Sequence, residues 1–377
     1  MVPEISLTDP EVLTDPFTAY GRARGESPLA RVSAPGFGPV WAVTRHEDAR
    51  AMLADRRFEL SPDSYQRPDV PEHCRPYLRT MSEMEGDEHA RLRRLVSPAF
   101  SARRALDFRP RIEPLVARLI DELSAEADLL RDFARPLPMD VICELVGIPH
   151  PDRPRWREYG AAVASGHGQA FAASIPGIMA GARAAIARRR ESPGDDILSD
   201  LLAVDGVTEA ELVTLVWHLV LAGQTPANLI ANAVAALLDH PGQLAALRAD
   251  PGLMPHAVDE LIRWCGPTLL TIPRYAREDV ELHGVRIPRG DAIVAAVAAV
   301  NRDPRSFPAP DVLDVTKPAS GHLGFGHGPH FCLGASLARV QTEVALNALL
   351  RRPLAPVTVE RAPDPGTWRL SALVVKL

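Results

Sequence analysis

One cysteine in a glycine-rich loop constrains this chain more than any other feature. Residues 325–334, FGHGPHFCLG, end a long irregular stretch, and the helical spacing of apolar residues resumes directly after them. We therefore expect Cys332 at the N-terminus of a helix, where unpaired N–H groups and a partial positive charge favour a thiolate. Gly326, Gly328 and Gly334 permit unusual backbone dihedrals and the close approach of a flat macrocycle. The loop predicts a thiolate ligand to a metal.

Three other interpretations of this loop fit less well. His327, His330 and Cys332 could bind zinc, but a tetrahedral site needs a fourth ligand and better-spaced pairs. A dinucleotide-binding loop requires a strand directly before the glycines, and no clear strand precedes them. A buried structural cysteine would not need so many flanking glycines.

The bulk properties are those of an ordinary globular protein. The chain has 377 residues, of which 46% are hydrophobic and 24% charged, and its net charge of −6 argues against bulk attraction to nucleic acid. None of the four cysteines forms a C-x-x-C pair, which indicates reduced thiols in a cytoplasmic protein. No signal peptide is visible at the N-terminus. The longest apolar stretch, 212–223, is too short to span a bilayer, so no membrane association is expected.

Helical patterns dominate the chain and predict one mostly α domain over 1–377. Thr208 and Glu211 form a capping-box pattern before a helix running toward Leu237. Alternation around a glycine predicts a β-hairpin over 280–287. The remaining expectations are helices from about Asp87 onward and over 139–146, 242–248, 254–264 and 333–349, and loops over 71–79, 188–196 and 303–328.

The Cys332 loop resembles the haem-binding loop of the cytochrome P450 family. Phe325, Gly326, Gly328, Cys332 and Gly334 fill every fixed position of that motif. The resemblance extends from about Trp41 to the C-terminus and is closest to soluble bacterial members. It implies the cytochrome P450 fold, a helical domain with small β-sheets enclosing haem b, with the thiolate of Cys332 on the iron.

The resemblance also assigns residues around the haem. His89, Arg93, Arg274 and His330 correspond to the contacts of the haem propionates, a role for which cationic donors are suited. Phe325, Gly326 and Gly334 would pack against the macrocycle. Leu269, Leu270 and Thr271 resemble the segment that lines the substrate pocket, residues 62–82 resemble a mobile loop over that pocket, and 368–372 resemble a C-terminal turn entering it.

A glutamate–arginine pair resembles the family's structural E-x-x-R motif. Glu260 and Arg263 lie on one face of a helix. The family usually adds an arginine from the irregular segment, but Val312 occupies that position here. Lys317 or His322 is the expected substitute.

The distal helix departs from the family pattern. Residues 219–228, LVLAGQTPAN, resemble the helix over the oxygen-binding face, where relatives have an acid–alcohol pair after Ala-Gly. Anchored on the flanking apolar positions, Gln224 and Thr225 take the place of that pair behind Ala222 and Gly223, and the carboxylate is absent. Pro226 has no N–H and should leave the Ala222 carbonyl without its usual donor. We expect a kink there, with water or substrate completing the proton path.

The resemblance implies a haem-thiolate monooxygenase of specialised metabolism. The expected substrate is a small or medium organic molecule, possibly carrier-bound, and hydroxylation is the default reaction. Electrons would come from NAD(P)H through ferredoxin reductase and a ferredoxin, for which Arg91, Arg94, Arg103 and Arg104 could provide a basic face. The altered distal motif raises two alternatives. The first is a less usual oxidation, such as coupling, epoxidation or a peroxide-driven reaction, and the second is a haem-binding recruitment module without oxygenase activity.

Overall fold

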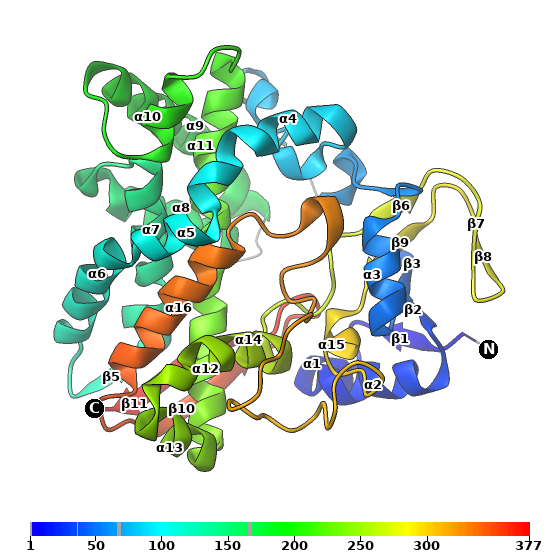
Figure 1. Ribbon diagram of the computed structural model, residues 1–377. Coiled ribbons are helices and arrows are strands. Elements are labelled where there is room, and N and C mark those ends of the chain that lie inside the picture. Colours follow the sequence, from blue (N-terminus) through cyan, green and yellow to red (C-terminus); the bar gives the residue numbers. More distant parts are fainter. Residues whose placement is uncertain (1, 36, 66–68, 165–167) are drawn as a thin grey trace.

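The computed structural model describes residues 2–35, 37–65, 69–164 and 168–377, and most of the chain is helical. The large sheet and the β7–β8 hairpin lie on the side of the N-terminus, whereas most helices and the small sheet β10-β11-β5 lie on the side of the C-terminus (Figure 1). The helices are α1 (Pro10–Thr14), α2 (Pro16–Glu26), α3 (His46–Ala54), α4 (Gly86–Val96), α5 (Ala102–Asp107), α6 (Arg109–Asp121), α7 (Pro136–Val146), α8 (Arg153–Ala164), α9 (Gly168–Glu191), α10 (Ile197–Leu202), α11 (Glu209–Ala222), α12 (Pro226–Asp239), α13 (Pro241–Ala249), α14 (Met254–Cys265), α15 (Val297–Val300) and α16 (Ala335–Leu349).

A six-stranded sheet has the order β1-β2-β3-β9-β6-β4, and smaller sheets join β10-β11-β5 and β7-β8. The strands are β1 (Glu4–Ser6), β2 (Leu29–Ala34), β3 (Phe37–Val43), β4 (Phe58–Glu59), β5 (Glu126–Asp128), β6 (Arg274–Ala276), β7 (Val280–Leu282), β8 (Val285–Ile287), β9 (Ala292–Ala295), β10 (Ala355–Ala362) and β11 (Arg369–Lys376). In the large sheet Arg274 of β6 is paired with Ile293 of β9, and this register fixes the arginine at the start of its strand.

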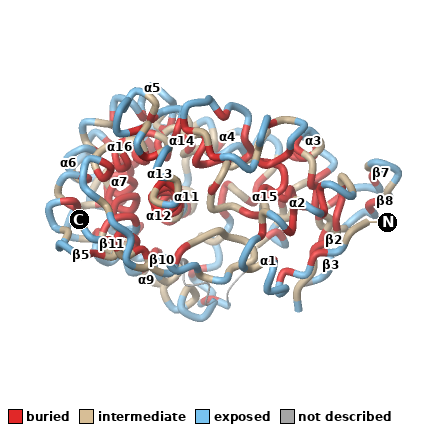
Figure 2. Tube along the Cα trace, turned by 90° about the horizontal axis from the view of Figure 1, so that it is seen from below, coloured by how far each residue is buried: buried red, intermediate tan, exposed pale blue. Residues whose placement is uncertain are grey.

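The capping box predicted at Thr208 is present. The Thr208 side chain accepts a hydrogen bond from the Glu211 N–H at 3.2 Å, and the Glu211 carboxylate accepts one from the Thr208 N–H at 2.9 Å. The helix that follows does not run unbroken toward Leu237, because α11 ends at Ala222 and α12 begins at Pro226. Viewed from below, these two helices lie among buried segments of the helical side (Figure 2).

Other local predictions divide between correct and wrong. The hairpin over 280–287 is confirmed as β7 and β8, and its turn residues His283 and Gly284 have φ of 51° and 75°, as a two-residue turn requires. The expected helices over 242–248 and 254–264 are confirmed as α13 and α14. The segment 71–79 is not all loop, since a 3₁₀ helix spans Glu72–Tyr77, and α9 continues through Glu191 into the loop expected over 188–196.

Two apolar helical segments are long enough to cross a membrane by length and composition. They are Gly168–Glu191 and the combined α11–α12 segment, Glu209–Asp239. The sequence prediction considered only 212–223 and underestimated the length of the second segment. Within the described residues, 67% of its most apolar window is buried inside the protein, as in a core helix. Length and apolarity are therefore weak grounds for a membrane span here.

Candidate haem site

Cys332 lies where the glycine loop turns into α16. The Cys332 N–H donates to the carbonyl oxygen of Phe325 at 2.8 Å, which closes the loop on itself. Gly326 and Gly328 have φ of 71° and 74°, a region that glycine enters without a steric penalty. The same expectation is wrong for Gly334, whose φ is −84°, and open space lies where a side chain at Gly334 would point.

The surroundings of Cys332 shift the pKa of its thiol in both directions. Burial raises its pKa above the ordinary value, while the Gly334 N–H and the positive charges of Arg93 and Arg339 lower it. The helix start therefore does not by itself produce a thiolate, and coordination to a metal would complete the deprotonation. Cys332 is exposed, although nearby protein atoms desolvate its thiol.

Four cationic or polar side chains predicted to hold propionates come together around this loop. The imidazole rings of His89 and His330 stack with centroids 4.2 Å apart, and Arg93 donates to the carbonyl oxygen of Phe331. Arg274 is buried, and desolvation lowers its pKa. The structure thus joins residues from α4, β6 and the Cys332 loop in one cluster.

This cluster is short of negative charge. Among the described residues, Glu85 is the one carboxylate whose charge acts on Arg274, and Glu85 also lies 3.2 Å from His330. Within the same part of the chain, the Arg274 guanidinium makes no hydrogen bond, although the backbone of this residue pairs with Ile293 of β9. Burying an arginine without a counter-charge is costly, and the two carboxylates of a haem would supply the missing charge. The residues present therefore fit haem-thiolate iron.

The Glu260–Arg263 pair is buried and bidentate. Nε and Nη2 of Arg263 donate to the two carboxylate oxygens of Glu260, each at 2.7 Å. A third partner from the irregular segment is present, but it is backbone. Arg263 donates to the carbonyl oxygens of Asn301 at 3.0 Å, Pro310 at 2.7 Å and Val312 at 3.3 Å.

Neither expected substitute for the missing arginine contacts Glu260. Lys317 pairs with Asp314 at 2.8 Å, and His322 pairs with Asp259 at 3.3 Å. The Val312 side chain is exposed, and the Asp314 N–H donates to Glu260 at 3.1 Å. The expectation of a basic substitute was wrong because main-chain groups of the irregular segment satisfy the pair without one.

The distal segment is broken where the sequence placed a kink, but the Ala222 carbonyl is not left unpaired. It accepts hydrogen bonds from the Thr225 hydroxyl at 3.0 Å and from the Thr225 N–H at 3.3 Å. Ala222 and Thr225 are both exposed, whereas Leu221 and Pro226 beside them are buried. Ala222 at the end of α11 and Thr225 in the break before α12 are therefore exposed positions between two largely buried helices.

Gln224 and Gly223 lie against other helices. A Cβ built on Gly160 of α8 would lie 2.3 Å from Oε1 of Gln224, so this side chain occupies the space beside that glycine. A Cβ on Gly223 would lie 2.4 Å from the Ile142 side chain, so this glycine permits close packing of α11 on α7. Of the four distal residues, Ala222 and Thr225 are the exposed ones, whereas Gly223 and Gln224 are partly buried.

The predicted pocket segment is mostly structural. Leu269 is buried in the core beside the large sheet, and the Thr271 hydroxyl accepts a hydrogen bond from the Ala295 N–H at 2.8 Å. Leu270 is half-buried, and Ile272, which the sequence analysis passed over, is 44% exposed. The apolar surface offered by this segment therefore comes from Leu270 and Ile272.

Two further segments were assigned to the pocket. The stretch 62–82 contains short 3₁₀ helices, and its residues 66–68 lie outside the described part of the chain. The stretch 368–372 is not a turn, since strand β11 begins at Arg369. Trp368 packs edge-on against Phe17 with centroids 5.3 Å apart, so its ring belongs to the packing of the N-terminal region.

The sequence did not predict a role for two residues near Cys332, Glu85 and Arg339. Glu85 accepts a hydrogen bond from the Leu60 N–H at 2.9 Å and pairs with His330. Arg339 donates to Asp259 at 2.6 Å and lies over the Phe325 ring, 4.8 Å from its centroid. Arg339 lies in the second turn of α16, the helix that follows the Cys332 loop, so its place near the start of that helix could have drawn attention to it.

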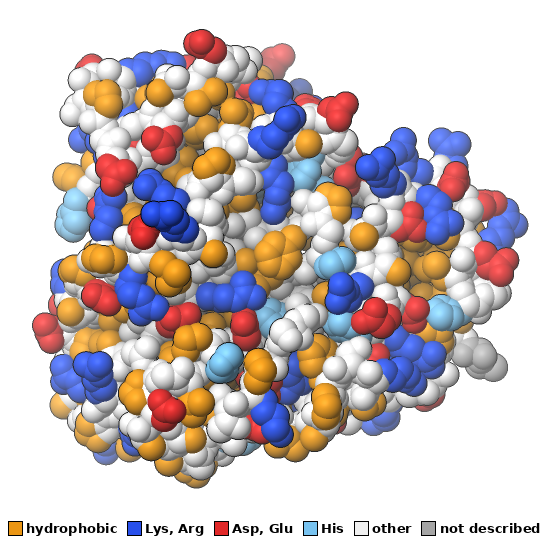
Figure 3. Space-filling view, in the orientation of Figure 1, with side chains coloured by type: hydrophobic (Ala, Val, Ile, Leu, Met, Phe, Trp, Pro, Cys, Tyr) orange, Lys and Arg blue, Asp and Glu red, His pale blue; other side chains and the backbone are white. Residues whose placement is uncertain are grey.

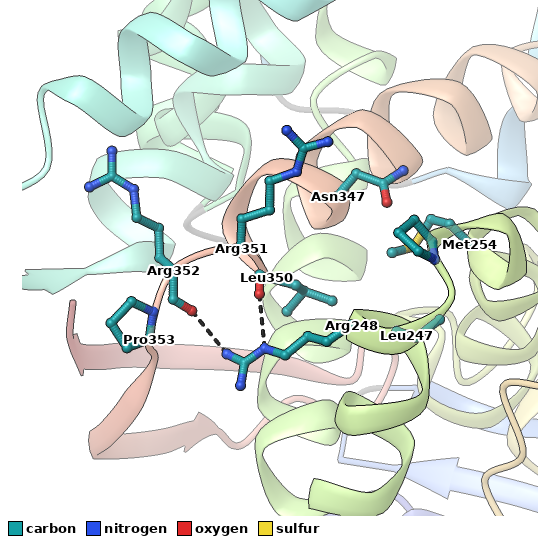
Figure 4. A pocket seen from close by; sticks show the side chains of 9 residues that line it. Leu247, Arg248, Met254, Asn347, Leu350, Arg351, Arg352 and Pro353 are labelled. Atoms are coloured by element: carbon teal, nitrogen blue, oxygen red, sulfur yellow. Dashed lines mark hydrogen bonds between the residues drawn. The ribbon is translucent and has the colours of Figure 1, made fainter.

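A pocket of about 520 Å³ lies at the other end of α16, among α13, α14 and the segment after α16 (Figure 4). The Arg248 guanidinium crosses it and donates to the carbonyl oxygens of Leu350 and Arg352, each at 2.9 Å. These bonds cap the C-terminal end of α16. Since Cys332 precedes the start of that helix, this pocket is separate from the candidate haem site.

Comparison with known proteins gives one consistent family. The profile of the family described as "Cytochrome P450" matches residues 178–354. The chain is 36% identical to "Cytochrome P450 107B1" of Saccharopolyspora erythraea, over 99% of this chain and 96% of that protein. It is 41% identical to "Mycinamicin IV hydroxylase/epoxidase" of Micromonospora griseorubida, over 88% and 87%.

A solved structure agrees over nearly the full length. P450BioI in complex with an acyl carrier protein ligated to hexadec-9Z-enoic acid superposes with a TM-score of 0.90 at 33% identity. The match covers 98% of this chain and 100% of that one.

Proposed function

The chain belongs to the cytochrome P450 family, and on that premise we propose that it is a cytoplasmic haem b monooxygenase that oxidises a small or medium organic molecule of specialised metabolism. Hydroxylation is the default reaction. Relatives are named as a hydroxylase/epoxidase and as a cytochrome P450 monooxygenase, which favours catalysis over the alternative of a recruitment module without oxygenase activity. The single observation that carries the proposal is the Cys332 loop with its charge-deficient cluster of cations.

The residues of this cluster would hold the haem. Cys332 would ligate the iron, and Arg93, Arg274, His89 and His330 would face its two propionates. When bound, the haem supplies oxygen activation, with the thiolate donating electron density. The Gly334 N–H on the sulfur and the charges of Arg93 and Arg339 moderate that donation.

On the distal side, Thr225 and Ala222 are the residues proposed to handle protons. The Thr225 hydroxyl has one donor, which it gives to the Ala222 carbonyl, and lone pairs that remain free to accept from a water. Gln224 cannot ionise, and its amide packs beside Gly160. Protons would therefore pass through water ordered by Thr225 rather than through a carboxylate.

The ferrous–CO difference spectrum of the purified protein tests the proposal. A strongly red-shifted Soret band in the native protein, lost in Cys332→Ser, is the expected result. The matched control is Cys265→Ser, a buried cysteine on α14 whose thiol bonds the Leu261 carbonyl and which should keep the red-shifted band. An unshifted band from folded native protein would overturn the proposal.

A separate electron donor completes the proposed reaction, and we expect an acidic ferredoxin with its NAD(P)H-dependent reductase. Of the four arginines first expected to form a basic face, Arg91, Arg103 and Arg104 each pair with a carboxylate. Arg94 has no carboxylate partner among the described residues. Basic and acidic side chains are intermixed on the face drawn in Figure 3.

The better-placed charges lie beside the Cys332 loop. A pocket of about 210 Å³ there is lined in part by Arg50, His327, Phe331 and Arg339. Within the described part of the chain, the Arg50 side chain has neither a hydrogen bond nor an ion pair, and its backbone belongs to α3. The unpaired Arg50 guanidinium near the proposed iron ligand suits an acidic donor that must approach the haem edge.

A carrier-bound substrate is the second candidate. A structural relative was solved with a fatty acid ligated to an acyl carrier protein, and its match covers 98% of this chain. The test compares the spin-state shift produced by a free acid with that produced by the same acid on a carrier protein. A shift with the carrier-bound form alone would establish this candidate, and an equal response would exclude a need for the carrier.

A further inference from the structure

A second carboxylate of α14 pairs with the helix that follows the Cys332 loop. Asp259 accepts a hydrogen bond from Nε of Arg339 on α16 at 2.6 Å, and the two side chains are 30% and 31% exposed. Glu260, the next residue, pairs with Arg263 within α14 instead. Asp259 therefore joins α14 to the first turns of α16, and the E-x-x-R pair does not account for it.

A histidine of the irregular segment bonds to the same carboxylate oxygen. Nδ1 of His322 accepts a hydrogen bond from the Gly324 N–H at 3.2 Å, so this nitrogen carries no proton. The imidazole proton is therefore on Nε2, which donates to Oδ1 of Asp259 at 3.3 Å. His322 is buried and neutral in this arrangement, so Arg339 is the one cation bonded to Asp259 among the described residues.

Arg339 lies against the loop that contains Cys332. Its guanidinium is over the Phe325 ring, 4.8 Å from the centroid, and the Phe325 carbonyl oxygen accepts the Cys332 N–H at 2.8 Å. Burial raises the pKa of the Cys332 thiol, and the positive charge of Arg339 is among the influences that lower it. The arginine is therefore close enough to the sulfur for its charge to favour the thiolate.

Asp259 is ionised and compensates part of this positive charge. Burial opposes ionisation of its carboxyl, but hydrogen bonds from His322 and Arg339 outweigh burial and hold the pKa below the ordinary value. Within the described part of the chain, Asp259 is the one carboxylate that pairs with Arg339. Charges that are partly shielded from water are screened less than exposed ones, so this carboxylate controls how much of the arginine's charge acts at the sulfur.

We propose that Asp259 positions Arg339 so that its partly compensated charge sets the reduction potential of the haem that Cys332 ligates. Asp259 acts through Arg339, and His322 holds Asp259 in place, so both are positioning residues and not catalytic ones. The inference rests on the proposed haem-thiolate function and adds to it a control of electron uptake. It requires that loss of the carboxylate and loss of the cation have opposite effects.

The reduction potential of the haem-loaded, substrate-free protein tests this role, measured by potentiometric titration with redox mediators at fixed ionic strength. Reduction adds an electron, so a positive charge beside the thiolate favours the ferrous state and a negative charge disfavours it. Asp259→Asn leaves Arg339 uncompensated and should raise the potential. Arg339→Gln removes the cation, leaves the carboxylate and should lower it. At the native midpoint, each should change the ferrous-to-ferric ratio by about three- to tenfold, in opposite directions.

Further variants separate charge from structure. Asp259→Glu and Arg339→Lys keep both charges and should keep the potential near its native value. In the double variant, Asp259→Asn with Arg339→Gln, the two opposite shifts should largely cancel, because both charges are gone. The matched controls Asp279→Asn and Arg286→Gln make the same changes in an exposed ion pair on the β7–β8 hairpin and should leave the potential unchanged.

A purely structural role of the pair would lower Tm in both single variants without opposite shifts of the potential. Shifts of the same sign, or native potentials in both, therefore overturn the inference. If Arg339→Gln does not retain haem, the isosteric Asp259→Asn decides alone, and a potential that does not rise overturns the inference. The ferrous–CO band separates this failure from failure of the proposed function, because a retained red-shifted band leaves the haem-thiolate assignment standing.

Discussion

The hydroxyl of Thr225 donates to the carbonyl oxygen of Ala222 at 3.0 Å. In an unbroken helix that carbonyl would accept the N–H of residue 226, but Pro226 has none. The threonine side chain supplies the bond that the proline removes, and the helix breaks across residues 223–225. One exposed side chain thus satisfies the backbone carbonyl and keeps lone pairs on its oxygen free to accept.

Replacing Thr225 by valine separates these roles from side-chain size. Thr225→Val should destabilise the protein by about 1 kcal/mol, because a carbonyl loses its hydroxyl donor. It should also lower the fraction of consumed NAD(P)H that appears as product, since water loses its ordering group. Thr225→Ser should retain most of both properties. Thermal unfolding and the ratio of product to NAD(P)H measure them, and unchanged coupling in both Thr225→Ala and Gln224→Ala would exclude a distal role for this segment.

The Glu260–Arg263 pair should be sensitive to loss of either partner. Glu260→Gln leaves the buried Arg263 without its counter-charge, and we expect a loss of about 3–5 kcal/mol in the free energy of unfolding. Lys317→Ala is the matched control, because Lys317 is exposed and pairs with Asp314. It should cost less than about 1 kcal/mol. Denaturant unfolding measures both, and equal losses would show that Lys317 does support the pair.

These two cases show what the sequence could and could not predict. The FGHGPHFCLG loop, the capping box at Thr208 and the 280–287 hairpin are local signals, and the structure contains all three elements. The partners of Arg263 were unpredictable, because backbone carbonyls from the irregular segment carry no residue code. The pairing of Glu85 with His330 joins segments far apart in the chain, and no spacing rule reaches that far.

The prediction for the distal helix was partly wrong for a related reason. The sequence located the break correctly at Pro226, since a missing N–H is a property of one residue. The sequence predicted that the Ala222 carbonyl would lack a hydrogen-bond donor. That prediction was wrong because the donor is the Thr225 hydroxyl, whose position depends on the side-chain rotamer. Likewise, Leu269 and Thr271 match a pocket segment by position, but core packing and pairing with Ala295 occupy them.

Haem binding should offset the charge of Arg274. Arg274→Gln removes a buried cation whose charge the described carboxylates compensate poorly. The variant should therefore bind haem more weakly than the native protein, whereas without haem the two proteins should have similar stability. The control is Arg277→Gln, an exposed residue on the same segment that pairs with Glu59 at 3.2 Å. Haem transfer to a scavenger apoprotein measures the release rate, and identical rates for both variants would contradict a role of Arg274 at the propionates.

Acid should destabilise the protein partly through His218. Its folded-state pKa of about 4 lies below the ordinary value of 6.5, so the unfolded chain binds more protons between these values. The contribution of the neutral imidazole is fully present above pH 6.5 and is lost as the pH falls toward 4. His218→Leu should therefore flatten the fall in Tm over this window, whereas the exposed His256→Leu should not. Parallel Tm curves for the native protein and His218→Leu would contradict the assignment.

Electron transfer should depend on the cations beside the loop. Arg50→Glu reverses an unpaired charge in the pocket that Arg50 shares with His327 and Phe331, and should raise the KM for ferredoxin several-fold, most strongly at low salt. Arg286→Glu on the β7–β8 hairpin reverses an exposed arginine that pairs with Asp279 and should leave this KM unchanged. Reduction by dithionite should be equal in all three proteins, and a KM that is insensitive to Arg50 would place the donor elsewhere.

The two glycines of the Cys332 loop with positive φ should respond differently to alanine. At Gly326, a Cβ would find its nearest neighbour at 3.7 Å, so Gly326→Ala carries mainly the cost of a positive φ, about 1–2 kcal/mol. At Gly328, a Cβ would lie 2.7 Å from the Leu53 carbonyl oxygen and 3.2 Å from Cα of Ala54, and backbone cannot move aside as a side chain can. Gly328→Ala should therefore be the more destabilising change and should displace the loop from α3, lowering haem content as well as Tm. Equal losses of Tm and haem in the two variants would show that backbone strain, rather than contact with α3, makes Gly328 necessary.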